Sequence, residues 1–203
     1  DDTLVLSSRK GLPKEISSDA AHSVQLKTAR PLLSFRSGKC AVAENRIGKG
    51  RVYYVASENT SGAELIALYD TLLRRAGISL DTDVTAKNGS FAYNVELQLL
   101  DRGENQVHYL VNWTPLYSGM YLLTPSWKPS ENGRWYVTDL ISRKALLVNG
   151  RREWTERDLR QGILLLLPAQ VRTLILVSSK PFEGTSGTIS ASDYHSQWMR
   201  LNQ

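Results

Sequence analysis

Between residues 84 and 178 the sequence alternates between short apolar stretches and turn-forming residues. An apolar residue at every second position is clearest over 91–99 and again over 107–113, as in strands with one buried face. Pro residues and Asn-Gly pairs separate several of the later apolar stretches, which are 120–123, 135–140, 145–148, 163–167 and 171–177. About seven short strands at this spacing predict an antiparallel β-sandwich over residues 84–178.

Residues 1–83 carry a different pattern, in which short apolar runs precede one helical segment. Residues 37–39 and 48–50 each place glycine in a short polar gap between apolar runs, which predicts two hairpin turns. Over residues 61–77 apolar positions recur at helical spacing, and Ser61 and Glu64 have the spacing of a capping box. The chain is therefore predicted to be α+β, with a mixed module over 1–83 that ends in the helix 61–77.

The last segment, residues 179–203, begins with the Gly, Ser and Thr that are typical of linkers. Tyr194, Trp198 and Leu201 then follow one another at the i, i+4, i+7 spacing of one helix face. A linker and a short docked helix are the expected structures here.

Composition excludes several classes of partner and site. The longest apolar run, Ile163–Leu167, is much shorter than the roughly 20 residues that a membrane span needs. A single cysteine, Cys40, rules out an internal disulfide framework and is expected to be buried and inert. The excess of 25 Lys and Arg over 20 Asp and Glu is modest, and acidic residues interrupt the basic ones between Arg143 and Arg160. That segment is expected to be salt-bridged, so no nucleic-acid partner is predicted.

The first residues lack a signal peptide, which leaves the compartment unknown. A secreted or periplasmic location stays open if a signal has been removed upstream.

The sequence contains no residue spacing that is typical of a catalytic or metal-binding motif. His22, His108 and His195 are scattered, without partners at metal-ligand spacing, and His108 is expected on the exposed face of its strand. Glu96 is expected on a solvated face, and Asp139 is expected to cap a turn. The sequence therefore predicts no catalytic residue, no metal and no cofactor in this chain.

Aromatic residues offer one alternative. Trp113 alternates with apolar positions and is expected in the core, whereas Trp127 and Trp135 lie near turns. Exposed aromatic rings stack on sugar rings, so Trp127 and Trp135 are candidates for a saccharide platform. Large aromatics that fill the corners of a sandwich are the competing interpretation, and the sequence leaves both open.

Two stretches resemble a known family. Residues 37–56, which end in Gly-Arg-Val-Tyr-Tyr-Val-Ala, and the helical segment after them look like the end of the amidotransferase-like trimerisation domain of family 42 β-galactosidases. The strand 107–114, which includes Asn112, and the stretches 139–144 and 158–177 resemble the small C-terminal β-domain of such glycoside hydrolases. The resemblance covers about residues 30–178 and rests on structural turns. The catalytic barrel and the front half of the amidotransferase-like domain have no counterpart in the chain.

The resemblance implies a non-catalytic accessory or assembly region of a glycoside-hydrolase-like protein. Its implied partners are the catalytic barrel of the same protein and further copies of the chain in a homo-oligomer. A carbohydrate-binding module that uses Trp127 and Trp135 is the alternative function. Whether the chain belongs to an enzyme is left uncertain, because no catalytic residue can be carried over.

Overall fold

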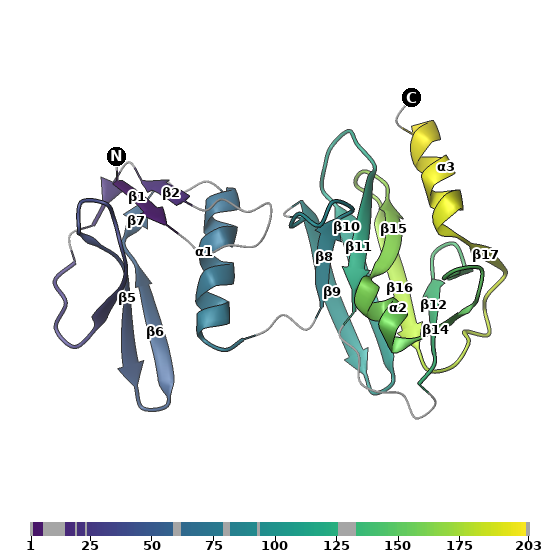
Figure 1. Cartoon of the computed structure of the whole chain (residues 1–203), viewed down its shortest axis with the longest axis horizontal. Coiled ribbons are helices and arrows are strands. Elements are labelled where there is room, and N and C mark those ends of the chain that lie inside the picture. Colours follow the sequence, from purple (N-terminus) through teal and green to yellow (C-terminus); the bar gives the residue numbers. More distant parts are fainter. Residues whose placement is uncertain are drawn as a thin grey trace. The chain divides into compact units, whose positions relative to one another are not determined.

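The computed structural model describes residues 2–5, 15–18, 20–22, 24–58, 62–78, 82–92, 94–125 and 133–201 (Figure 1). Within these residues strands dominate and three helices are present, so the chain is α+β or mostly β. The chain divides into two compact units, Asp1–Ser79 and Leu80–Gln203, which are described separately.

The N-terminal unit is built around a three-stranded antiparallel sheet of β4 (Arg30–Ser34), β5 (Cys40–Ile47) and β6 (Gly50–Val55). Both predicted hairpin turns are confirmed, since β4 pairs with β5 around residues 35–39 and β5 pairs with β6 around Gly48. Two short antiparallel pairs accompany this sheet, namely β1 (Asp2–Val5) with β2 (Glu15–Ser18) and β3 (Ala20–Ala21) with β7 (Ser57–Glu58).

Helix α1 (Gly62–Arg75) falls within the predicted segment 61–77, and Gly77 follows it with a φ of 78°. That left-handed conformation suits glycine after a helix end. Ser61, the expected cap residue, lies outside the described residues.

In the three-stranded sheet, the Glu44 side chain is buried, with 1% of the residue exposed, and Arg30 donates to its carboxylate at 2.5 and 2.8 Å. The pKa of Glu44 is lowered, chiefly by this hydrogen bonding.

The C-terminal unit has two sheets. The larger has seven strands: β9 (Val95–Arg102), β10 (Asn105–Asn112), β12 (Trp135–Asp139), β13 (Lys144–Leu146), β14 (Glu153–Trp154), β16 (Arg172–Ser178) and β17 (Gly187–Ile189). The smaller has three: β8 (Asp83–Ala86), β11 (Gly119–Thr124) and β15 (Ile163–Leu167). One buried cluster draws residues from both sheets, among them Leu110, Leu123, Leu165 and Ile175. This β-rich unit is compatible with the predicted sandwich.

Strand β16 is central in the larger sheet, because it pairs with β10 on one side and β12 on the other.

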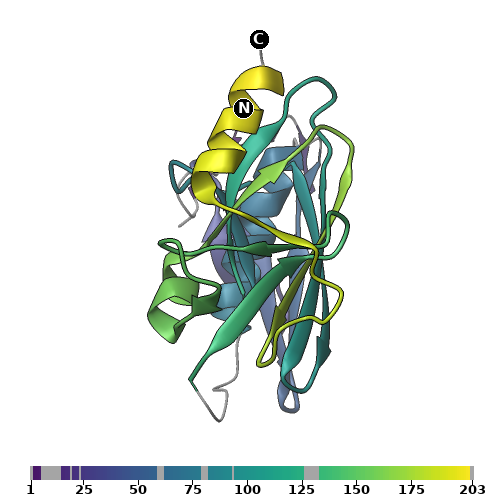
Figure 2. The same cartoon turned by 90° about the vertical axis from the view of Figure 1, so that its right-hand side faces the viewer.

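The segment 179–203, expected to form a linker and a docked helix, also contributes a strand to the larger sheet. Strand β17 pairs in parallel with β13, and helix α3 (Ala191–Leu201) follows it (Figure 2). Tyr194 of this helix is 6% exposed and belongs to the core cluster, whereas Leu201 is exposed.

Two burial predictions, one within β10 and one for the residue just after it, are wrong. His108 is 0% exposed instead of being at the surface, and Trp113 is 58% exposed instead of being in the core. The register explains both, because Arg102 pairs with Asn105 across a two-residue turn and therefore Leu97 pairs with Leu110. Odd positions of β9 consequently share a face with even positions of β10, and the even positions of β10 point into the core.

Candidate functional site

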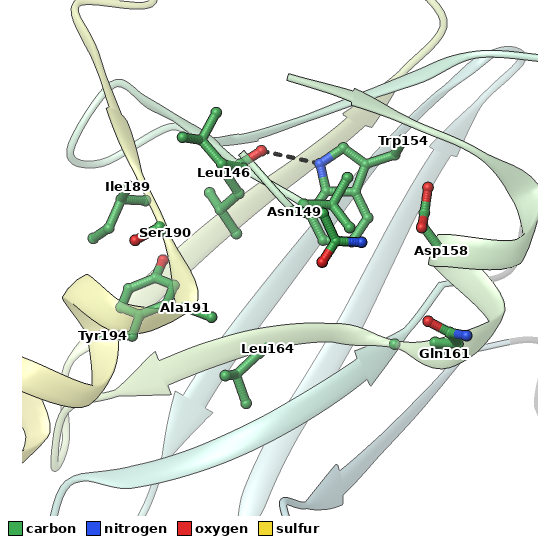
Figure 3. Close-up of a pocket in the computed structure, with 13 residues that line it drawn as sticks. Leu146, Asn149, Trp154, Asp158, Gln161, Leu164, Ile189, Ser190, Ala191 and Tyr194 are labelled. Atoms are coloured by element: carbon green, nitrogen blue, oxygen red, sulfur yellow. Dashed lines mark hydrogen bonds between the residues drawn. The ribbon is translucent and has the colours of Figure 1, made fainter. Parts of the chain in front are cut away.

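A small pocket with polar walls lies in the C-terminal unit, between the turn after β13, helix α2 (Glu156–Gln161) and the junction of β17 with α3 (Figure 3). Its volume is about 150 Å³, about five times the share of liquid volume that one water takes. Its lining consists of Leu146, Leu147, Val148, Asn149, Trp154, Asp158, Gln161, Gly162, Leu164, Ile189, Ser190, Ala191 and Tyr194.

The first wall comes from a tight turn. Val148 and Arg151 exchange two backbone hydrogen bonds of 2.9 Å each, with Asn149 and Gly150 between them. Asn149 has a φ of 49° and Gly150 a φ of 78°, the left-handed values that Asn-Gly adopts in a type I′ turn. The turn therefore fixes the backbone of Asn149, whose side chain lies at the pocket (Figure 3).

The second wall is helix α2, whose first turn is closed by a capping box. The Thr155 hydroxyl accepts from the Asp158 backbone N–H at 3.3 Å, and Asp158 Oδ2 accepts from the Thr155 N–H at 2.8 Å. Arg151 lies 3.4 Å from the same oxygen. Burial raises the pKa of Asp158, but these hydrogen bonds and Arg151 outweigh it, so the pKa is lowered and the carboxylate is ionised at neutral pH.

Gly162 fixes the direction in which the chain leaves α2. Its φ of 95° with a ψ of 147° is a conformation that other residues rarely adopt, and a Cβ there would lie 3.3 Å from the Leu122 Cβ. Gln161, the last helical residue, thereby ends at the rim of the pocket, and Leu164 forms part of its floor. In Figure 3 the Gln161 carboxamide and the Asp158 carboxylate lie on the same side of the pocket.

The third wall is the start of α3. Ser190 caps this helix, since its hydroxyl accepts from the Asp193 N–H at 3.3 Å while Asp193 Oδ2 accepts from the Ser190 N–H at 2.7 Å. One turn on, Tyr194 lies across the pocket from Asp158 (Figure 3). Burial, helped by the charge of Asp139, raises the pKa of Tyr194, so the phenol is protonated and available as a donor at neutral pH.

Trp154 completes the pocket on its apolar side. The ring is 5% exposed, and its Nε1–H donates to the Leu146 carbonyl oxygen at 2.9 Å. Because that bond ties Trp154 of β14 to β13, the indole cannot turn without breaking it. The pocket thus combines a rigid aromatic wall with one carboxylate, one phenol and two carboxamides.

The lining offers polar groups that can hydrogen-bond a ligand, without the paired residues that bond cleavage commonly uses. Asp158 is the only lining residue with a charged side chain, so the pocket has no second carboxylate for glycoside hydrolysis and no nucleophile–base pair. Across the described ranges, no cluster of three or more His, Cys, Asp or Glu could hold a metal ion. The helices seen there are also too short or too polar to cross a membrane.

The residues proposed from sequence for sugar binding do not come together at this pocket. Trp127 lies outside the described residues, so the pair itself stays untested. Trp135 is 2% exposed and pairs with Trp154 across β12 and β14, in the core. A ring buried on both faces has no surface for a sugar, so the structure favours the core-packing interpretation for Trp135.

Other sequence predictions have clear outcomes. Asp139 does cap a turn, since its Oδ1 accepts from the N–H groups of Ile141 and Ser142 at 2.9 and 3.3 Å. The basic segment is salt-bridged, with Arg151 on Asp158 and Arg160 on Glu156. Cys40 is half-buried, and burial raises the pKa of its thiol.

A buried polar network around Asn112 escaped the sequence reasoning. Asn112 is 0% exposed, and its amide donates to the Tyr117 and Leu167 carbonyl oxygens at 3.0 and 3.1 Å. Its oxygen accepts from Asn94 at 2.9 Å and from the Thr114 N–H at 3.1 Å. The network ties β10 to β15 and to the loop before β11, so Asn112 acts as an internal cross-link.

Comparison with known proteins shows which solved structures have a similar fold. The sequence matches no protein-family model, and no curated protein sequence matches it significantly. The structure is similar to that of a β-galactosidase from Bacillus circulans sp. alkalophilus, with a TM-score of 0.50 and 18% identity over 88% of this chain and 22% of that chain. A β-galactosidase from Rahnella sp. R3 gives a TM-score of 0.48 and 15% identity over 87% of this chain and 22% of that chain. The likeness to the Bacillus enzyme shows that this chain shares its fold with about a fifth of a β-galactosidase.

Proposed function

We propose that the chain is a non-catalytic accessory and assembly region of a glycoside-hydrolase-like protein. The observation that carries this proposal is the match of most of this chain to only 22% of the Bacillus β-galactosidase. That proportion fits a part that accompanies a larger catalytic domain. The pocket supports the proposal, because it has the polar groups for binding but no pair of acids for hydrolysis.

In this proposal the N-terminal unit is the end of an amidotransferase-like domain of a family 42 β-galactosidase-like protein, and it contributes to self-association. Ile47, Val52 and Tyr54 of β5 and β6 are 63%, 51% and 50% exposed. Strand β6 also pairs only with β5 among the described strands. Exposed apolar side chains beside an edge strand are typical of a surface that another protein surface covers.

The first test is enzymatic. The 203-residue chain, made in a host without β-galactosidase, should not turn over an aryl β-galactoside. Activity that follows the chain through purification and disappears when it is unfolded would contradict the proposal.

The second test concerns assembly. Light scattering of the complete parent protein should give an oligomer that a Val52→Lys, Tyr54→Lys double variant weakens. Leu100→Lys is the matched control, because Leu100 is 68% exposed but belongs to β9 of the other unit. An unchanged oligomer in the double variant would exclude this surface from assembly.

A third test concerns the catalytic barrel. The barrel, expressed separately, should bind the chain, and failure to bind under conditions where both are folded would exclude a bracing role.

A further inference from the structure

We propose that the pocket between α2, α3 and the 148–151 turn binds a single neutral sugar ring. This proposal goes beyond the accessory function and rests on other observations: the unused polar groups of the pocket, its charge, and its apolar wall.

The polar groups of the pocket are left without protein partners. Asp158 receives all its hydrogen bonds on Oδ2, which leaves Oδ1 free. The carboxamides of Asn149 and Gln161 and the hydroxyl of Tyr194 likewise have no hydrogen-bond partner among the described residues. Four side chains from three elements therefore present unused donors and acceptors to one small volume. Such groups bind a ligand that both donates and accepts.

The charge of the pocket favours a neutral ligand. Asp158 carries its only charge, and no Lys or Arg lines it, so an anion would meet a carboxylate without a compensating cation. A cation is disfavoured as well, because Arg151 already pairs with Asp158 at 3.4 Å. A neutral ligand that carries hydroxyl groups fits this pocket, since each hydroxyl donates one hydrogen bond and accepts others.

The apolar surface and the size of the pocket restrict the class of ligand further. Trp154, Leu164 and Ile189 contribute apolar surface between the polar groups (Figure 3). A sugar ring has hydroxyl groups around its edge and C–H groups on its faces, so it matches a pocket that is polar on some walls and apolar on others. The volume of about 150 Å³ limits the enclosed part of a ligand to about the size of one ring.

The site is also held in shape before any ligand binds. The type I′ turn fixes the backbone of Asn149, the capping box fixes the Asp158 side chain, and Gly162 fixes the backbone at the end of α2 beside Gln161. A site whose backbone and central carboxylate are already ordered loses less conformational entropy on binding. Weak, millimolar binding of a free monosaccharide is the expected affinity for so few contacts.

The test is a titration of the full chain with D-galactose, D-glucose and L-arabinose, each to about 100 mM, followed by NMR. At least one sugar should shift the indole N–H signal of Trp154, and saturation transfer should reach the ring protons of that sugar. Absence of both effects for all three sugars would overturn the proposal. A shift with ethanolamine but with none of the sugars would overturn it too.

Three variants locate the site without disturbing the fold. Tyr194→Phe removes only the hydroxyl, Gln161→Ala shortens an exposed helix end, and Asn149→Gly keeps a residue that accepts the positive φ. Each should weaken binding by about fivefold, the effect of losing one hydrogen bond. Gln170→Gly is the matched control, because Gln170 has a φ of 57° but lies outside the pocket, and it should bind as the original chain does. Binding that all three variants leave unchanged would place the sugar elsewhere and refute the proposal.

A negative result here leaves the accessory function standing, because that function rests on the fold likeness. Conversely, glycosidase turnover by the chain would contradict the accessory function and would leave the sugar titration to be judged by the variants alone.

Discussion

Acidification should destabilise the C-terminal unit through one residue, His108. The side chain is 0% exposed, and neither ring nitrogen has a hydrogen-bond partner among the described residues. Burial therefore lowers the pKa of His108 from 6.5 to about 4, while the charge of Asp101 opposes this in part. The folded state thus holds a neutral imidazole where the unfolded chain binds a proton.

The sign and size of the effect follow from proton linkage. Above pH 6.5 His108 is neutral in both states, and between 6.5 and about 4 only the unfolded chain binds the proton. Stability is therefore lost as the pH falls through this window and levels off below it. A pKa difference from 6.5 to about 4, at about 1.4 kcal/mol per pKa unit, gives a loss of at most about 3 kcal/mol.

The assay is urea unfolding followed by tryptophan fluorescence at several pH values across the window. All five tryptophans lie beyond residue 100, so the signal reports the C-terminal unit alone. His108→Leu removes the titrating group and leaves no buried polar nitrogen, so the variant should lose less stability on acidification. Asp158 and Asp193, whose pKa values are lowered, lose their stabilising effect at lower pH and are present in both proteins. An equal loss of stability in the two proteins between pH 6.5 and 4 would refute the argument.

Three further changes should destabilise the same unit, and the same urea assay measures them. Asn112→Ala should cost about 2–4 kcal/mol, because it leaves several buried partners unsatisfied; a cost below about 1 kcal/mol would contradict the internal cross-link. Asp158→Ala should cost about 1–2 kcal/mol by opening the capping box, whereas Asp158→Asn, which keeps an acceptor, should cost less. Gly162→Ala should cost about 1–3 kcal/mol and more than Gly103→Ala, because only Gly162 combines a positive φ with the nearby Leu122; equal costs would contradict this.

The local elements could be predicted from the sequence because neighbouring residues determine them. The turns at 37–39 and 48–50 need glycine, and helix α1 needs an apolar stripe, so each of these elements can be recognised from a short stretch of sequence. The faces of β10 could not be predicted from that strand alone, since both of its faces carry apolar residues. The two-residue turn before it contained the missing information: odd residues of β9 must lie opposite even residues of β10.

The pocket lay beyond sequence reasoning for a different reason. Asn149 and Asp158 lie nine residues apart, Tyr194 follows 36 residues after Asp158, and the three meet only through tertiary structure. The one local signal was the Asn149-Gly150 pair, which predicted a turn but could not say what the turn would face. Asn112 illustrates the same limit, because a single polar residue in a strand does not show what its side chain will bond to.

The place of β16 in the larger sheet has a consequence for synthesis on the ribosome. The hairpin of β9 and β10 is complete about 60 residues before β16 begins, so it waits with one edge unpaired. The core closes later still, when β17 pairs with β13 and α3 brings Tyr194 onto it. A nascent chain therefore exposes an apolar strand edge while residues 113–171 are made, and this interval is when it is most vulnerable to aggregation. Slow translation between residues 112 and 172 would lengthen that exposure, and a chaperone that covers strand edges would shorten it.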